Sequence, residues 1–101
     1  MTDEDAREYV KMLSEQERHV LGICSKRRSF GYSRIASKLN LENDAVRSAG
    51  RKLTAMNLAN VSPVRHGNEY AGSAIFLNDR GDAVKAALPR KYVSESNAQD
   101  R

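Results

Sequence analysis

Residues 32–61, YSRIASKLNLENDAVRSAGRKLTAMNLANV, decide the fold of this 101-residue chain. Apolar residues recur at helical spacing over two parts of this stretch, at about 33–39 and at about 43–56. A tight turn before Leu41 separates the two predicted helices, and Asn57 is of a residue type that closes helices in the left-handed conformation. The stretch therefore predicts two helices packed against each other at an angle.

The second of these helices has one apolar and one polar side. Val46, Gly50 and Leu53 share a face that we expect to point to the core. A glycine inside a helix costs about 1 kcal/mol relative to alanine. Close backbone contact with the preceding helix would offset that cost at Gly50, although a tolerant position would also carry a glycine. Asn43 is the preferred N-cap, with Glu42 as the alternative.

Start and stop signals outline the rest of the chain. Capping-box patterns begin two helices at Thr2 and Ser14, and strand-forming residues flank a turn at 66–69. The expected fold is mainly α with a small β-hairpin. Its other elements are helices at about 3–12, from Ser14 to about Lys26 and at about 79–88, a short bridge at 29–32, and strands at 60–65 and 70–77. By domain, we expect an N-terminal helix at 1–13, a folded domain at 14–89 and a polar, disordered tail at 90–101.

Positive charge is concentrated in the middle of the chain. Residues 26–65 carry nine basic and two acidic side chains, a net +7, whereas residues 1–25 carry −3 and residues 66–101 are neutral. Such an uneven distribution favours an anionic partner. Combined with two helices joined by a tight turn, it points to double-stranded DNA.

Composition limits the classes of protein to be considered. A chain of this length forms one domain, and 40% hydrophobic residues suffice for one core. The acidic start, residues 1–5, does not resemble a secretory signal, and no apolar run is long enough to span a membrane. With Cys24 as the only cysteine, no internal disulfide can form, so we expect a cytoplasmic protein, associated with the nucleoid if it is prokaryotic.

The sequence contains no recognisable catalytic constellation. Glu15 and His19 are spaced i, i+4, which fits a metal pair, but without a third ligand a surface pair is the better interpretation. Cys24 lies on an apolar stripe and is expected to pack as a small hydrophobe. We therefore expect no enzyme activity, no metal site and no cofactor.

At this point the chain resembles the winged helix-turn-helix family of transcription regulators. The resemblance covers roughly residues 14–88: the quoted stretch matches the two central helices, and residues 75–88, IFLNDRGDAVKAAL, look like the strand and helix after the wing in small repressors of the MarR (multiple-antibiotic-resistance) and PadR kinds. The resemblance implies a helix that enters the major groove and a hairpin, the wing, that reaches the minor groove or flanking phosphates.

The outward side of the helix at 43–56 holds the candidates for base reading. Arg47 and Arg51 lie one turn apart, and a guanidinium matches guanine O6 and N7 with two parallel donors. The full set of candidate base readers is Asn43, Asp44, Arg47, Ser48 and Arg51. The candidate phosphate contacts are Lys26, Arg27, Arg28, Ser33, Arg34, Lys38 and Lys52. The alternative is that these are solvated surface residues, and Lys26 to Arg28 also suit the negative end of their helix.

Two further surfaces are expected from the resemblance. The wing tip would contact DNA through Arg65, His66 and Asn68, unless the hairpin turn merely happens to contain an arginine. The terminal helices would build a two-fold homodimer, with candidate residues Tyr9, Val10, Leu13, Val84 and Leu88. The alternative is that these five residues complete the core of a single chain.

The sequence therefore predicts a sequence-specific, double-stranded-DNA-binding transcriptional regulator, acting as a repressor by covering a promoter. No pocket for a small-molecule effector is expected in so short a chain. The alternative is a winged-helix module that binds protein in a replication, transcription or phage-control assembly. Exposed apolar residues at 44–52 would favour the alternative, and arginines there favour DNA.

Overall fold

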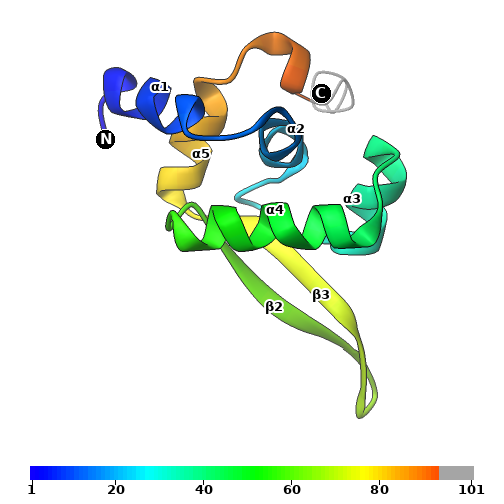
Figure 1. Ribbon diagram of the computed structural model, residues 1–101. Coiled ribbons are helices and arrows are strands. Elements are labelled where there is room, and N and C mark those ends of the chain that lie inside the picture. Colours follow the sequence, from blue (N-terminus) through cyan, green and yellow to red (C-terminus); the bar gives the residue numbers. More distant parts are fainter. Residues whose placement is uncertain (94–101) are drawn as a thin grey trace, which may run out of the picture.

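Five α-helices and a small antiparallel sheet make up the part of the chain that the computed structural model describes, residues 1–93 (Figure 1). In order, the elements are α1 (Asp3–Lys11), α2 (Glu15–Ile23), β1 (Phe30–Gly31), α3 (Tyr32–Leu39), α4 (Asn43–Ala55), β2 (Ala59–His66), β3 (Glu69–Leu77), α5 (Asp79–Ala86) and a 3-10 turn, η1 (Arg90–Tyr92). The expected order of helices and strands is confirmed. The fold is a winged helix-turn-helix, mainly helical with one hairpin.

The sheet has the strand order β1-β3-β2, so that the hairpin of β2 and β3 is anchored to the helices through the short strand β1. Phe30 pairs with Ile75, and Val61 pairs with the same residue from the other side. Pro63 lies in β2, an edge strand, where its missing N–H is tolerated. The far half of the hairpin extends beyond the helices as a wing (Figure 1).

The core lies where α2, α3, α4 and the near end of the hairpin meet. Leu21, Ile35 and Leu53, one from each of these helices, are fully buried, and Ile75 joins them from β3. Burial of a large aliphatic side chain contributes roughly 1.5–3 kcal/mol, so this cluster sets the positions of the helices relative to the wing.

The helix starts follow the local signals closely. Thr2 and Ser14 both form reciprocal capping boxes, with Asp5 and with Glu17. Asn57 has a φ of 61°, and Asn40 closes α3 in the same left-handed conformation. Each contact spans only a few residues, which explains why the sequence predicted it.

Several expected boundaries are wrong. Helix α2 ends at Ile23 and not near Lys26, because Ser25 offers its backbone oxygen to the N–H of Leu77 in the sheet. Glu42, not Asn43, is the N-cap of α4, and it caps without a side-chain hydrogen bond. Helix α5 ends at Ala86, before the expected residue 88.

The C-terminal boundary also differs from the expectation. Residues 90–92, which we expected in a disordered tail, form η1 against α2, and the side chain of Tyr92 is only 5% exposed. Its hydroxyl donates to Glu15 over 2.6 Å, and its ring packs edge-on against His19. The remainder of the predicted tail, residues 94–101, lies outside the described residues.

Candidate nucleic-acid interface

Helix α4 presents one buried and one exposed side. Its buried residues are Val46, Ala49, Gly50 and Leu53. The exposed ones include all five candidate base readers, Asn43, Asp44, Arg47, Ser48 and Arg51, together with Lys52. The expected polarity of this helix is confirmed: apolar residues hold it against the core, and its cations face outward.

Gly50 allows α3 and α4 to approach closely, although the contact is not the backbone contact we expected. The ring of Tyr32, the first residue of α3, lies directly over Gly50. A Cβ at position 50 would stand 2.9 Å from Cζ of Tyr32 and closer still to its hydroxyl oxygen. The glycine therefore makes room for an aromatic side chain of the preceding helix.

A hollow of about 540 Å³ lies in the angle between α4 and the hairpin. The residues that line it are Tyr32, Arg47, Arg51, Thr54, Ala55, Val61, Tyr70 and Ser73. Two of them are cationic and none is acidic. On the hairpin wall the hydroxyls of Tyr70 and Ser73 lie 2.7 Å apart, and the exposed Val61 supplies an apolar surface. The hollow thus combines positive charge, hydroxyl groups and apolar wall, a combination that suits an anion with an apolar neighbour.

Tyr32 forms part of the floor of this hollow. The residue is 8% exposed, and its side chain lines the hollow. Burial raises the pKa of Tyr32, with the buried Cys24 adding to the effect and Arg47 and Arg51 opposing it. The phenol therefore keeps its proton at neutral pH and can donate a hydrogen bond.

The other candidate phosphate residues are spread over several faces. Ser33, Arg27 and Arg28 are exposed. Lys26 binds Asp79 at the start of α5 over 2.7 Å, which raises the pKa of Lys26 and lowers that of Asp79. Lys26 therefore links the loop after α2 to the start of α5, a contact that the sequence did not reveal.

Arg34 and Lys38 extend from α3 in different surroundings. The guanidinium of Arg34 lies 5.5 Å from the ring centroid of Phe30. Lys38 lines a separate hollow with His19, Lys91 and Tyr92, and it does not line the hollow beside α4. The structure thus does not bring Lys38 together with Arg47 and Arg51.

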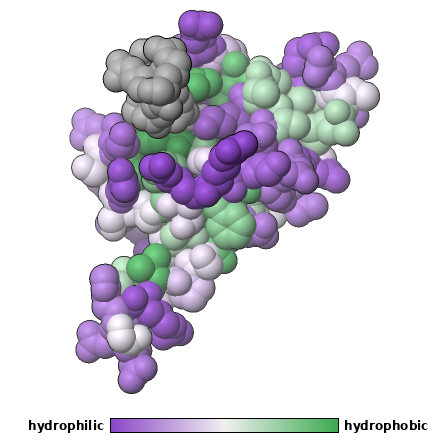
Figure 2. All heavy atoms as spheres, turned by 180° about the vertical axis from the view of Figure 1, so that it is seen from behind, coloured by the Kyte–Doolittle hydropathy of each residue, from purple (hydrophilic) through white to green (hydrophobic). Residues whose placement is uncertain are grey.

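The wing ends in a two-residue turn. Arg65, His66 and Asn68 are exposed there, and Gly67 has a φ of 65°. Asn68 does not share that sign of φ, so the glycine occupies the first central position of a type II′ turn, where other residues are strained. The tip is hydrophilic and projects from the body (Figure 2).

The five candidate dimer residues lie mostly inside one chain. Val10, Leu13, Val84 and Leu88 are buried where α1 packs on α5. All four belong to the core of the single chain, which agrees with the alternative interpretation. Their part in a two-fold dimer stays a prediction.

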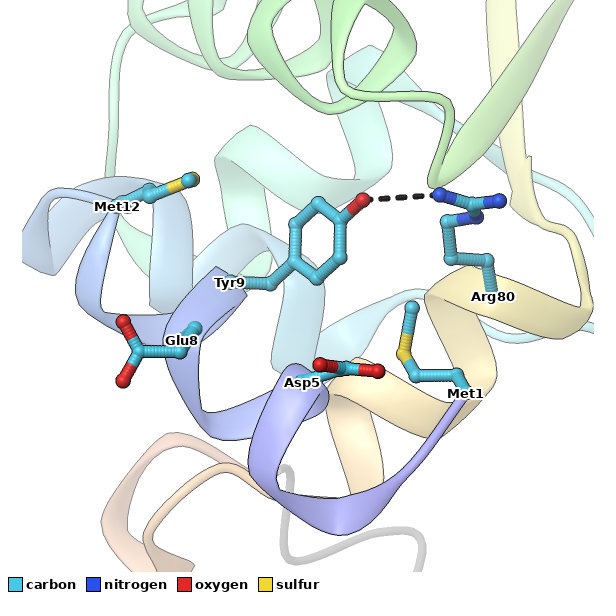
Figure 3. Close-up of a pocket in the computed structure, with 6 residues that line it drawn as sticks. All are labelled: Met1, Asp5, Glu8, Tyr9, Met12 and Arg80. Atoms are coloured by element: carbon cyan, nitrogen blue, oxygen red, sulfur yellow. Dashed lines mark hydrogen bonds between the residues drawn. The ribbon is translucent and has the colours of Figure 1, made fainter.

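Tyr9 is the exception among these five, because it remains partly exposed. Its hydroxyl accepts a hydrogen bond from Arg80 over 2.9 Å beside a hollow between α1 and α5 (Figure 3). Met1 and Met12, both more than half exposed, stand on either side of that hollow. Tyr9 thus joins the two terminal helices of one chain.

His19 and Cys24, whose side chains could bind a metal or act as a nucleophile, both lie in contacts that support the fold. His19 Nε2 lies 3.5 Å from Glu15 Oε2 on the surface of α2, so the two form a surface pair. Cys24 is fully buried, and burial raises the pKa of its thiol to about 12. Within residues 1–93 no three His, Cys, Asp or Glu side chains gather as a metal site would require, and no helix is long and apolar enough to cross a membrane.

Some residues of the hollow were missed from the sequence. Tyr70 and Ser73 were assigned only to a strand, and Tyr32 only to a bridge. One signal was available: Tyr32 immediately precedes the predicted helix at 33–39, which we expected to pack against Gly50, and in the structure it is the first residue of α3. Tyr70 and Ser73 gave none, because their position beside α4 depends on how the hairpin leaves the core.

Comparisons with known proteins place the chain by its fold. No protein family matches the sequence, and no curated protein matches it either. Solved structures do match. The zinc-responsive MarR family member ZitR of Lactococcus lactis is 23% identical, with a TM-score of 0.61 over 74% of this chain and 50% of its own.

Two other solved structures match more of the chain. FabT of Streptococcus pneumoniae, solved in complex with DNA, is 15% identical with a TM-score of 0.61 over 86% of this chain and 66% of its own. The Bacillus subtilis protein YusO is 17% identical with a TM-score of 0.59 over 94% of this chain and 72% of its own. The chain therefore has the winged-helix fold of MarR regulators, and it spans half to about two thirds of the length of ZitR and FabT.

Proposed function

We propose that this chain binds double-stranded DNA in a sequence-specific manner and regulates transcription. The observation that carries the proposal is the polarity of α4, where Val46 and Leu53 are fully buried while Arg47, Ser48 and Arg51 are exposed. A helix held in this way can enter the major groove with its polar side toward the bases. The DNA complex of FabT, a protein of the same fold, supports the proposal.

The finer part of the proposal concerns mechanism. A domain of this size that covers a promoter would act as a repressor by occlusion. The wing tip at 65–68 would contact the minor groove or the flanking phosphates, and Ser33 and Arg34 at the start of α3 would contact the backbone. The candidates for reading bases are Asn43, Asp44, Arg47, Ser48 and Arg51.

Selection of bound duplexes from a random pool, beside sizing of the free protein, tests this function. With four to six phosphates contacted, log K should fall against log salt with a slope of roughly −4 to −5. Arg51→Ala should cost about 1–3 kcal/mol and relax the preference at one base pair. No enriched sequence and a slope near zero would refute DNA binding. A palindromic winner would indicate two bound copies, and a single half-site would indicate one.

A protein-binding role for the same face has less support. That role requires exposed apolar side chains on α4, and the outward residues between 44 and 52 are polar or charged. The positive charges among them favour nucleic acid over protein as the partner of this face.

A further inference from the structure

Arg47 and Arg51 share a direction on α4 that Ser48 and Lys52 do not take. Successive residues of a helix are about 100° apart around the axis, so Arg47 and Ser48 point to different sides. Arg47 lines the hollow between α4 and the hairpin, together with Arg51 one turn later, whereas Ser48 and Lys52 do not. Both arginines thus extend toward the wing, and Ser48 lies nearer the outermost side of the helix. Burial raises the pKa of Tyr32, and of the two arginines Arg47 opposes that rise more than Arg51 does, which pairs Arg47 with this phenol.

The groups around Arg47 suit a phosphate better than a base edge. Tyr32 lines the same hollow, and Ser73 and Tyr70 add hydroxyls on the hairpin wall. No carboxylate lines the hollow. Asp44 lies 3.9 Å from Arg47 and its side chain is 94% exposed, so solvent screens its charge. An anion in the hollow would therefore meet two guanidinium groups and a phenol, and no carboxylate in the hollow neutralises the two positive charges.

The apolar part of the hollow fits what accompanies a phosphate in DNA. Val61 and Tyr70 are exposed, at 39% and 60%, and with Ala55 they form a wall on which a deoxyribose can pack. A helix in the major groove and a wing at the neighbouring minor groove lie on either side of one sugar–phosphate strand. That strand must pass through the angle between α4 and the hairpin, which is where this hollow lies.

We propose that Arg47 and the hydroxyl of Tyr32 together bind one backbone phosphate in this hollow, so that Arg47 fixes the register of the DNA and does not read a base. The proposal rests on the DNA-binding function proposed above. It changes the assignment made from the sequence, in which Arg47 and Arg51 both read bases. Phosphate contacts position a protein on the duplex without carrying sequence information.

Two variants test the assignment on the duplex obtained by selection and on its single-base-pair variants. Tyr32→Phe removes only the hydroxyl and should weaken binding roughly tenfold for every duplex alike. Arg47→Ala should also weaken binding of all duplexes uniformly and make the salt slope shallower by about 0.9. The double variant should lose less than the sum of the single losses in log K, because both groups bind the same phosphate.

Duplexes with one neutral methylphosphonate at successive positions identify that phosphate. At one position the methylphosphonate should weaken DNA binding by the unaltered chain and leave DNA binding by Arg47→Ala unchanged. Lys11→Ala, which removes an exposed cation on the distant helix α1, is the matched control and should follow the unaltered chain throughout. Thermal unfolding of Tyr32→Phe checks that the fold is kept.

The outcomes separate the two proposals. If the unaltered chain binds DNA but Arg47→Ala relaxes the preference at one base pair with an unchanged salt slope, Arg47 reads a base and the inference is wrong. The inference is also wrong if Tyr32→Phe, still folded, binds as the unaltered chain does. If the unaltered chain shows no salt-dependent binding to any duplex, the proposed function itself fails.

Discussion

Gly22, near the end of α2, offers a sharp test of how residues 90–92 are held. A Cβ added there would stand 2.7 Å from the carbonyl carbon of Tyr92 and closer still to its oxygen. The obstacle is backbone, so no change of side-chain rotamer can relieve the clash. We expect Gly22→Ala to displace η1 from α2, which exposes the ring of Tyr92 and breaks its hydrogen bond to Glu15.

The size of the effect follows from three terms. Exposing the Tyr92 ring costs about 2 kcal/mol, and losing its 2.6 Å hydrogen bond costs about 1 kcal/mol. Alanine in place of glycine in a helix interior returns about 1 kcal/mol. The net loss is about 2 kcal/mol, which in a domain of this length lowers Tm by roughly 10 °C. The loss cannot grow much larger, because detachment of η1 relieves the clash completely.

Thermal and urea unfolding measure this loss, and a chain ending at Pro89 serves as the control. In the shortened chain the obstacle is absent, so Gly22→Ala should raise the free energy of unfolding by about 1 kcal/mol. The substitution therefore changes sign between the two backgrounds. Equal effects in both chains would show that η1 does not pack on Gly22, and the account of the C-terminal turn would fail.

Two further predictions concern titration. The hydrogen bond from Tyr92, more than the charge of Lys91, lowers the pKa of Glu15, so this carboxylate stabilises the fold above its unfolded pKa and the contribution fades as pH falls through the lower folded value. Tyr92→Phe should move the pKa of Glu15 back up by NMR titration, and an unmoved value would contradict the assignment. Burial raises the pKa of Cys24 to about 12, so the free energy of unfolding should fall by about 1.4 kcal/mol per pH unit above the usual thiol pKa near 8.5, relative to Cys24→Ala. If the free energy of unfolding, measured with urea, changes equally with pH in both proteins across pH 8–10, this prediction is wrong.

The features that the sequence predicted depend on contacts between close neighbours. The capping boxes of Thr2 and Ser14 join residues three apart, and the apolar face of α4 follows from helical spacing alone. Such signals operate wherever the rest of the chain lies. This is why the order of elements and the orientation of α4 could be read before the structure was known.

The features that the sequence did not reveal depend on contacts between distant residues. Helix α2 ends early because the oxygen of Ser25 meets the N–H of Leu77, 52 positions away. Tyr92 is one aromatic residue in a polar run, and its burial depends on the gap that Gly22 leaves in α2. Val84 and Leu88 have the spacing of an interface, and only the packing of α5 on α1 shows that the chain covers them itself.

The contact between Gly50 and Tyr32 connects the stability of the fold with the chemistry of the proposed site. A glycine at this position costs α4 about 1 kcal/mol, whereas burial of the Tyr32 ring contributes about 2 kcal/mol. The balance favours the glycine only because the ring lies over it. The same contact with Gly50 places the phenol of Tyr32 in the lining of the hollow that Arg47 also lines. An alanine at position 50 would push the hydroxyl from that floor while leaving both arginines in place. The packing of two helices therefore determines whether the hollow has two cationic donors alone or a phenol beside them.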